Sequence, residues 1–505
     1  MAHPDPRPVV RPSRQDEIAA AGSELLGGPT GRRAGWSSHR WPPVRIIALA
    51  MIGTFALGLV QKLPCARRGW FEGAATQYTH ACYSDIPHLY TARGFADGLI
   101  PYFQRIPEET SASMEYLEYP VLTGMFMELA SWFTPGVGLV ERPAQYYWLV
   151  NAALLLICAI VIAVCVTRTQ THRPWDGLLV ALAPAFALTA TINWDLLAVA
   201  LTAAAMLMWS RSRPLAAGVL IGLATAAKLY PLLLLGPLFL LCWRAGRWRA
   251  FSCVLTGATA AWLAVNLPFM LGATEGWAKF YTFSQERPVD FGSFWLILSH
   301  RTEWQLSSEL VNDLATLLML AGCGALAVLA LSARRRPRLA QLAFLVVALF
   351  ILTNKVYSPQ YVLWLIPLAV LARPRWRDFL IWQCCEVIYF LGIWYYLAEN
   401  AGAPGLPPGG YHLAITAHLL GTVYLCIIVV RDVLSPERDI VRLDGSDDPG
   451  GGVLDGSMDR FTLRKVRRHP LPEAVAEASH APTASPTASP TDRRPPDGAA
   501  VSRET

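Results

Sequence analysis

Long apolar runs are the feature that most constrains how this chain folds. The clearest are Tyr146 to Val166, Phe251 to Leu271, Val311 to Leu331, Phe379 to Leu397 and Tyr411 to Val430. Each is close to the roughly 20 residues that a helix needs to cross a bilayer. Because hydrocarbon offers no partner to backbone polar groups, such runs must bond internally as helices. The sequence therefore predicts an all-α polytopic membrane protein.

Shorter apolar runs add further predicted spans. They are Trp175 to Thr191, Leu196 to Trp209, Leu215 to Ala227, Leu229 to Trp243, Leu339 to Leu352 and Tyr361 to Leu371. With Ile46 to Val60 as an uncleaved anchor, we expect about twelve transmembrane helices. Composition agrees, because 53% of the 505 residues are hydrophobic and only 16% are charged, which is too apolar for a soluble protein of this size.

Basic clusters in alternate connections predict the orientation. Lys and Arg are retained on the cytoplasmic side, so we place there the N-terminal arginines and the clusters at 168–173, 211–213, 244–249, 334–338 and 373–377. The alternation requires Val121 to Phe133 to be a short amphipathic or re-entrant helix in the first outer loop, since a true span would invert everything after it. The net charge of +6 is thus interpreted as membrane orientation and not as nucleic-acid binding.

We expect three regions along the chain. Residues 1–45 form a cytoplasmic tail, residues 46–431 form the membrane domain with a long first outer loop at 63–144, and residues 432–505 form a cytoplasmic tail. Both tails are predicted to be disordered, and they offer places for cytoplasmic or cell-wall-assembly partners. Most cysteines lie in apolar runs and act as small hydrophobes. Only Cys65 and Cys82 lie in a polar loop, where a disulfide and two free thiols are both open alternatives.

The predicted outer connections carry the polar motifs. An ionisable group at the end of an apolar helix is costly and usually marks a water-filled cavity or a bound anion. We therefore expect the functional site on this outer face. The motifs are Tyr83-Ser84-Asp85, Glu118-Tyr119-Pro120, Asn193-Trp194-Asp195, Lys228-Leu229-Tyr230-Pro231 and Lys355-Val356-Tyr357-Ser358-Pro359-Gln360-Tyr361.

Asp85 is the first candidate for catalysis. It precedes a predicted short helix at Pro87 to Gly98, with Tyr83, His88 and Arg93 as neighbours. As an N-cap it would accept backbone N–H bonds. As a general base it would remove a proton from an acceptor hydroxyl. The two roles are compatible, because capping keeps the carboxylate charged.

Each other motif has a structural and a functional interpretation. Lys228 and Lys355 either snorkel as membrane anchors or line one pocket for a phosphate. Asn193 and Asp195 either cap the next span or bind sugar hydroxyls. Glu118 belongs either to a solvated loop or to a sugar-binding rim.

Signatures of several soluble enzyme classes are missing from the sequence. It has no Walker-type glycine loop and no His-Glu-x-x-His or paired Cys-x-x-Cys zinc motif. It also lacks the βαβ alternation that binds nucleotides. We predict no cofactor and no metal, and a sugar donor would have to arrive through the lipid phase.

Together the motifs resemble glycosyltransferase family 87, which includes polyprenyl-phosphate-mannose-dependent α-mannosyltransferases of bacterial envelope glycolipids. The resemblance covers Arg45 to Arg431. It implies a GT-C fold and inverting transfer from a lipid-linked donor to a cell-envelope glycolipid or glycan. Asp85 matches the catalytic base. It is followed by Ile86-Pro87 instead of completing an Asp-x-Asp pair, so a metal-bridged phosphate is not expected.

Site roles follow from this resemblance and from our own inference. We expect Lys228, Lys355 and Arg93 to bind the donor phosphate. The residues expected to contact sugar or acceptor are Tyr83, His88, Glu118, Tyr119, Asn193, Asp195, Tyr230, Tyr357 and Gln360.

Two rival functions are a transporter or lipid flippase and a non-catalytic scaffold for cell-wall assembly. A transporter predicts ionisable residues near mid-membrane and two similar halves, and the sequence shows neither. A scaffold would use its proline-rich tail as an interaction arm, so truncating the tail separates it from an enzyme.

Overall fold

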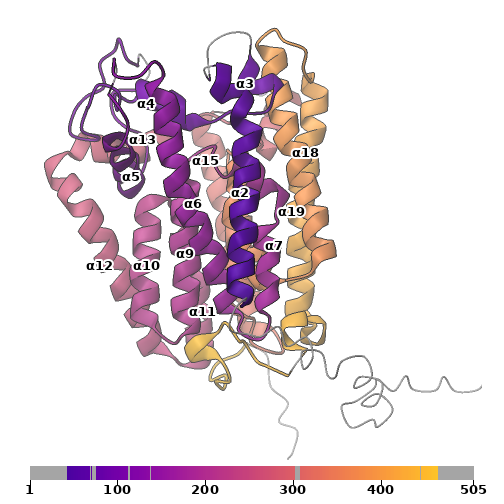
Figure 1. Ribbon diagram of the computed structural model, residues 1–505. Coiled ribbons are helices and arrows are strands. Elements are labelled where there is room, and N and C mark those ends of the chain that lie inside the picture. Colours follow the sequence, from indigo (N-terminus) through magenta and orange to yellow (C-terminus); the bar gives the residue numbers. More distant parts are fainter. Residues whose placement is uncertain are drawn as a thin grey trace, which may run out of the picture. The chain divides into compact units, whose positions relative to one another are not determined.

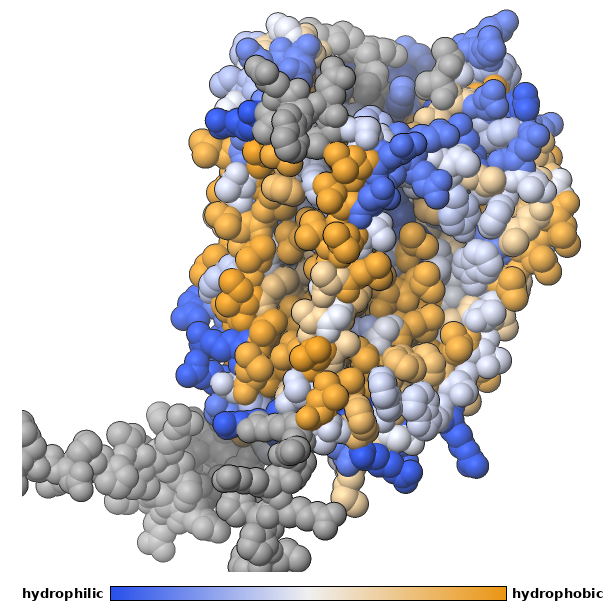
Figure 2. Space-filling model, turned by 180° about the vertical axis from the view of Figure 1, so that it is seen from behind, coloured by the Kyte–Doolittle hydropathy of each residue, from blue (hydrophilic) through white to orange (hydrophobic). Residues whose placement is uncertain are grey.

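The structure is a computed structural model that describes residues 42–463 apart from 69, 71–74, 112–113, 137, 302–306 and 444. Within these residues the regular elements are α-helices and short 3-10 helices (Figure 1). An apolar belt lies between two hydrophilic ends (Figure 2). The predicted all-α membrane architecture is therefore confirmed.

Six described helices are long and apolar enough to cross a membrane. They are α2 (Pro43–Arg68), α6 (Pro143–Thr169), α12 (Trp248–Gly272), α15 (Ser308–Ser332), α18 (Trp376–Asn400) and α19 (Pro408–Leu434). Shorter apolar helices are α9 (Asp195–Ser210), α10 (Pro214–Ala227), α11 (Leu235–Ala245) after η2 (Tyr230–Leu234), α16 (Leu339–Thr353) and α17 (Val362–Ala372) after η3 (Pro359–Tyr361). The count of about twelve passes stays a prediction.

Helices α10 and α12 pack with their backbones in direct contact. Gly218 and Gly222 form a small-residue pair four positions apart on α10. A Cβ added at Gly218 would lie 2.2 Å from the carbonyl oxygen of Val254, and one at Gly222 would lie 2.2 Å from that of Ala258. Such pairs let membrane helices approach closely. This packing fixes the position of α10, whose end carries Lys228.

The run at Trp175 to Thr191 is not one continuous helix. It consists of η1 (Pro174–Asp176), α7 (Gly177–Ala181) and α8 (Pro184–Thr189). Broken helices are tolerated in membranes where neighbours bind the freed backbone groups. Thr54 donates to the carbonyl of Ala181 at 2.6 Å, and the side chain of Gln383 accepts from the Ala185 N–H at 3.1 Å.

The connections gather at two ends of the bundle. The motif end carries α3 (Thr76–Thr79), α4 (Asp85–Ala92), α5 (Val121–Trp132), α13 (Thr274–Glu286) and α14 (Phe294–Arg301), and the first four stand together at the top of Figure 1. Helix α5 has 12 residues, about 18 Å, which is shorter than the roughly 30 Å hydrocarbon core. Its bounds match the predicted short helix, and its place in an outer loop stays a prediction.

The opposite end, here called the arginine end, holds the basic clusters and a folded C-terminal segment, residues 435–463. We predicted a disordered tail from 432 on, and the structure differs, because this segment supplies carboxylates to buried arginines. Arg338 binds Asp439 at 2.8 Å, Arg336 binds Asp459 at 2.7 Å and Arg244 also binds Asp459. Residues beyond 463, like those before 42, lie outside the described residues.

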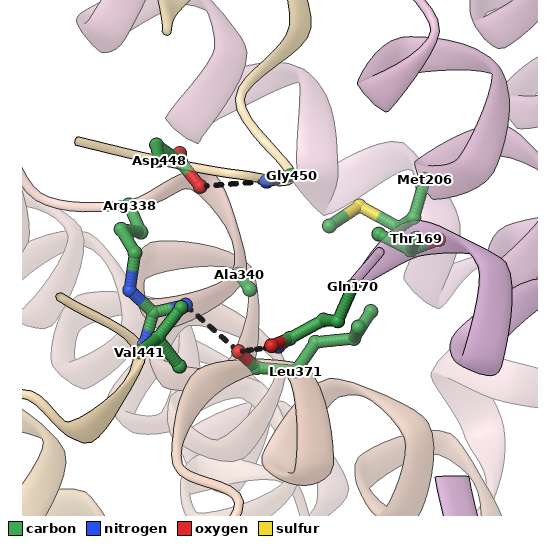
Figure 3. A pocket seen from close by; sticks show the side chains of 9 residues that line it. All are labelled: Thr169, Gln170, Met206, Arg338, Ala340, Leu371, Val441, Asp448 and Gly450. Carbon is green, nitrogen blue, oxygen red and sulfur yellow. Dashed lines mark hydrogen bonds between the residues drawn. The ribbon is translucent and has the colours of Figure 1, made fainter. Parts of the chain in front are cut away.

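Figure 3 shows a small pocket at this end, between the C-terminal segment and residues at or near the ends of α6, α9, α16 and α17. Arg338 and Gln170 both donate to the carbonyl of Leu371, at 2.8 and 2.9 Å. Asp448 accepts from the Gly450 N–H at 3.2 Å. Arg338 also binds Asp439, and Asp448 also accepts from the Leu339 N–H, so the pocket lies within the contact between the C-terminal segment and the bundle.

Replacing Asp439 tests whether the segment stabilises the fold. Arg338 and Asp439 are both about 1% exposed, and removing one partner of a buried ion pair costs about 3–5 kcal/mol. We expect Asp439→Asn to lower the thermal midpoint of the detergent-solubilised protein clearly. Glu437→Gln, at an exposed position of the same segment, is the matched control. Equal thermal midpoints for the two variants would contradict a stabilising role of the C-terminal segment.

Candidate functional site

Two motifs that are far apart in sequence are joined by hydrogen bonds at the motif end. The Asp85 N–H donates to the carbonyl of Ile192 at 2.8 Å, and the Ser84 hydroxyl donates to that of Thr191 at 2.7 Å. Ser84 also caps α4, because its hydroxyl oxygen accepts from the Ile86 N–H at 3.3 Å. The predicted helix at 87–98 therefore runs from 85 to 92, and Ser84, not Asp85, is its N-cap.

The Asp85 carboxylate is consequently available to side chains. One oxygen accepts from the Tyr83 hydroxyl at 2.7 Å, and the other accepts from the Asn193 amide at 2.8 Å. Asn193 is oriented by the Trp194 N–H, which donates to its oxygen at 2.6 Å, and its amide nitrogen also contacts the Tyr119 hydroxyl at 2.6 Å. Two donors on one carboxylate favour its ionised form, which is the form a base needs.

Burial acts in the opposite direction on this carboxylate. It raises the pKa of Asp85 above its usual value, while the bonds from Tyr83 and Asn193 and the charge of Lys228 partly offset the rise. A raised pKa makes a carboxylate a stronger general base near neutral pH. Burial and the neighbouring Asp85 charge also raise the pKa of Tyr83 well above its usual value, so its hydroxyl stays a donor.

Lys228 lies beside this cluster, at the end of α10. Its ammonium is 3.5 Å from a carboxylate oxygen of Asp195 and sits over the Tyr119 ring at 5.3 Å. The same Asp195 oxygen accepts from the Trp364 indole at 2.7 Å. The N-cap of α9 is Trp194 and makes no side-chain bond, so neither Asn193 nor Asp195 caps this helix with its side chain.

Lys355 belongs to a second cationic group. Its ammonium donates to the carbonyl of Gln285 at 2.8 Å, and its own carbonyl accepts from the Asp290 N–H at 3.0 Å. Asp290 in turn binds Arg287 at 2.9 Å. Within the described part of the chain no carboxylate lies within ion-pair distance of Lys355. Burial, with the charge of Arg287, lowers the pKa of Lys355.

Two predicted ligands turn out to be partners of each other. Arg93 and Glu118 form a two-pronged pair with both contacts at 2.7 Å, and each side chain is 10% exposed. A predicted phosphate ligand is thus already neutralised by a predicted sugar ligand. His88 is exposed on α4 and lies within range of the charges of Arg93, Asp85 and Glu118.

Three predicted sugar contacts lie in the interior instead. The Tyr230 hydroxyl contacts Thr202 at 3.1 Å, and the Tyr357 hydroxyl contacts Glu386 at 3.2 Å. Both tyrosines are about 1% exposed or less, and Gln360 is 8% exposed. A tyrosine beside a proline looks like a site residue in sequence, but here the chain folds it inward, so we assign these residues to packing.

The sequence analysis missed several residues of the site. Lys62 is fully buried in α2 and donates to the Tyr83 carbonyl at 2.9 Å. Arg287 accompanies Lys355, and the Tyr361 ring stacks on Trp364 at 4.0 Å. A lysine inside an apolar run was the one available signal for Lys62. Within the described residues, no group of three or more His, Cys, Asp or Glu side chains could hold a metal ion.

Comparison with known proteins finds a family similarity over part of the chain. Residues 116–353 match the model of glycosyltransferase family 87. A search of curated proteins finds no match. The matched region includes Asn193 and Lys228 and leaves out Asp85 and Lys355, so the latter two join the family region through the contacts described above.

Solved structures similar to this chain include the Archaeoglobus fulgidus oligosaccharyltransferase. The apo form of that enzyme has 12% sequence identity to this chain and a TM-score of 0.37. The form tethered to an acceptor peptide containing the NVT sequon has 11% identity and a TM-score of 0.36. Both comparisons cover 79% of this chain and 56% of the other, so this chain spans just over half the length of those structures.

Proposed function

We propose that this chain is a membrane glycosyltransferase of family 87, whose model its residues 116–353 match. We further propose that its donor is a polyprenyl-phosphate sugar. Mannose is our first candidate for the sugar, and a cell-envelope glycolipid or glycan is our candidate acceptor. With the arginine end in the cytoplasm, the motif end faces the outside of the cell membrane. A lipid-linked donor would reach that end along the apolar belt.

The observation that carries the proposal is the Asp85 carboxylate, bonded by Tyr83 and Asn193 and close to Lys228. We assign Asp85 as the general base. It removes the proton of the acceptor hydroxyl, and the acceptor oxygen forms a bond to the anomeric carbon from the face opposite the phosphate. The bond between that carbon and the phosphate oxygen breaks, and its electron pair leaves with polyprenyl phosphate. The configuration at the anomeric carbon is therefore inverted.

The leaving phosphate needs positive charge close to it. Arg93 and Arg287 are each paired with a carboxylate, and Lys228 shares Asp195 with Trp364. Among the described residues, the Lys355 ammonium bonds to a backbone carbonyl and to no carboxylate. An incoming phosphate would gain most from the cation whose charge is least compensated. We therefore assign Lys355 as the first phosphate ligand and Lys228 as the second.

Asp85→Asn keeps the size and most bonds of the side chain but cannot take a proton. Loss of a general base costs about 10²- to 10⁴-fold in rate, so we expect kcat for sugar transfer to fall by that factor. Donor binding should change little. The assay uses purified protein, radiolabelled polyprenyl-phosphate-mannose and a membrane lipid extract as the acceptor source.

Asp97→Asn, at an exposed position of the same loop, is the matched control and should retain normal activity. Full activity in Asp85→Asn would end the assignment of Asp85 as base. Transfer from a nucleotide sugar alone would refute the lipid-linked donor.

Lys355 gives the site a pH dependence. Its ammonium binds phosphate only below its pKa, which is lowered, so donor affinity should be lost on raising the pH earlier than an ordinary lysine would allow. In Lys355→Arg the positive charge persists to higher pH. The pH at which donor KM begins to rise should therefore be higher in this variant than in the wild type. Lys279→Arg, at a half-buried position of α13, serves as control. Identical KM profiles for wild type and Lys355→Arg would exclude Lys355 from the phosphate site.

A further inference from the structure

The end of α2 is fastened to the segment that leads into Asp85. The Lys62 ammonium donates to the Tyr83 carbonyl at 2.9 Å, and the Gln61 amide donates to that of Ala81 at 2.6 Å. Cys65 and Cys82 form a disulfide with their Cα atoms 5.9 Å apart. Three residues at the end of α2 thus hold the three residues that directly precede Ser84.

Lys62 cannot be explained as a snorkelling anchor. Its side chain is fully buried, whereas a snorkelling lysine keeps its charge in water. It sits over the Phe390 ring at 5.6 Å, and no ion pair joins it to a carboxylate in the part of the chain that the structure describes. A buried ammonium in a membrane helix is costly and is a functional candidate by default.

Tyr83 connects Lys62 to the proposed base. Its carbonyl accepts from Lys62, and its hydroxyl donates to Asp85 at 2.7 Å. The Lys62 ammonium is also within range of the Asp85 charge. The other charged or titratable groups that act on Asp85 include Lys228, Asp195 and Tyr119. Unlike these three groups, Lys62 also holds the backbone next to the proposed base, through the Tyr83 carbonyl.

We propose that Lys62 is a positioning residue for the transfer reaction, and that it acts together with the Cys65–Cys82 disulfide to hold the Tyr83–Asp85 segment in its reactive place. The inference rests on the proposed function. It assigns the disulfide a role in catalytic geometry, beyond the general stability that a cross-link provides. It also requires the motif end to lie in an oxidising compartment, where disulfides persist.

The test is a double-mutant cycle on transfer kinetics. Its members are Lys62→Met, the pair Cys65→Ser with Cys82→Ser, and the combination. If Lys62 and the disulfide hold the same segment, removing either should lower kcat by about tenfold or more with little change in donor KM. The loss of kcat in the combined variant should be clearly smaller than the product of the two separate losses, because coupled sites are not additive. Losses that multiply would overturn the inference.

The pH profile separates positioning and charge from a packing defect. Without the Lys62 ammonium the pKa of Asp85 rises further, so the acid limb of kcat/KM should move to higher pH in Lys62→Met. Lys62→Arg should restore part of kcat and return the limb towards wild type. A rate lowered equally at every pH, with no rescue by arginine, would contradict the inference. Lys279→Met, at a half-buried position of α13, is the matched control.

Two further measurements keep the result decisive. If Lys62→Met does not fold, as judged by its thermal midpoint, wild-type protein treated with a membrane-impermeant reductant replaces it, and undiminished kcat after complete reduction would overturn the role of the disulfide. Asp85→Asn is assayed alongside. An active Asp85→Asn refutes the proposed function itself, whereas an inactive Asp85→Asn with a wild-type-like Lys62→Met refutes only the present inference.

Discussion

The hydrogen bonds that join residues 84–85 to residues 191–193 are the constraint on which the site depends. The first loop also contacts the bundle elsewhere, as where the Thr123 hydroxyl donates to the carbonyl of Ala227 at 2.6 Å, but these contacts do not involve Asp85. The Asp85 N–H to Ile192 and the Asn193 amide to the Asp85 carboxylate fasten it to the start of α9. Because α9 and α10 are packed neighbours, the same contacts bring Asp85 to the side of Lys228.

The two ends of the bundle treat charge differently. At the arginine end, buried guanidinium groups receive carboxylates from the C-terminal segment and carbonyls from helix ends, and this arrangement suits a permanent closure. At the motif end, compensation is incomplete. Arg93 and Arg287 are paired with carboxylates. In the part of the chain that the structure describes, Lys355 bonds to a carbonyl and to no carboxylate, and Lys228 shares Asp195 with Trp364. Incomplete compensation leaves room for an anionic ligand, which supports the proposed phosphate site.

The sequence predicts much of the architecture because burial in a membrane follows from local composition. Apolar runs correspond to helices, the basic clusters share one end, and a short helix lies at Val121–Trp132 as predicted. The run at Trp175 to Thr191 is the exception. There Pro184 breaks the helix, and side chains distant in sequence, such as Thr54 and Gln383, bond to the backbone groups that the break leaves free.

The site is less predictable, because each polar residue takes its role from a neighbour distant in sequence. The motifs are on one end as expected, but nothing local indicates that Glu118 neutralises Arg93 or that Tyr230 and Tyr357 turn inward. The C-terminal segment looks disordered by composition, yet its aspartates match arginines more than a hundred positions away, as in the pair of Arg338 and Asp439. Lys62 is hidden because its partner is a carbonyl.

The most direct measurement of the central claim is the accessibility of the motif end in intact cells. Single cysteines replace His88 beside the proposed base and Leu229 beside Lys228, both exposed positions. A third replaces Arg247 at the arginine end, and all three are treated with a membrane-impermeant maleimide. The account predicts that the first two react from outside the cell and that the third reacts only after the membrane is opened. Labelling of positions 88 and 229 from opposite sides would contradict it.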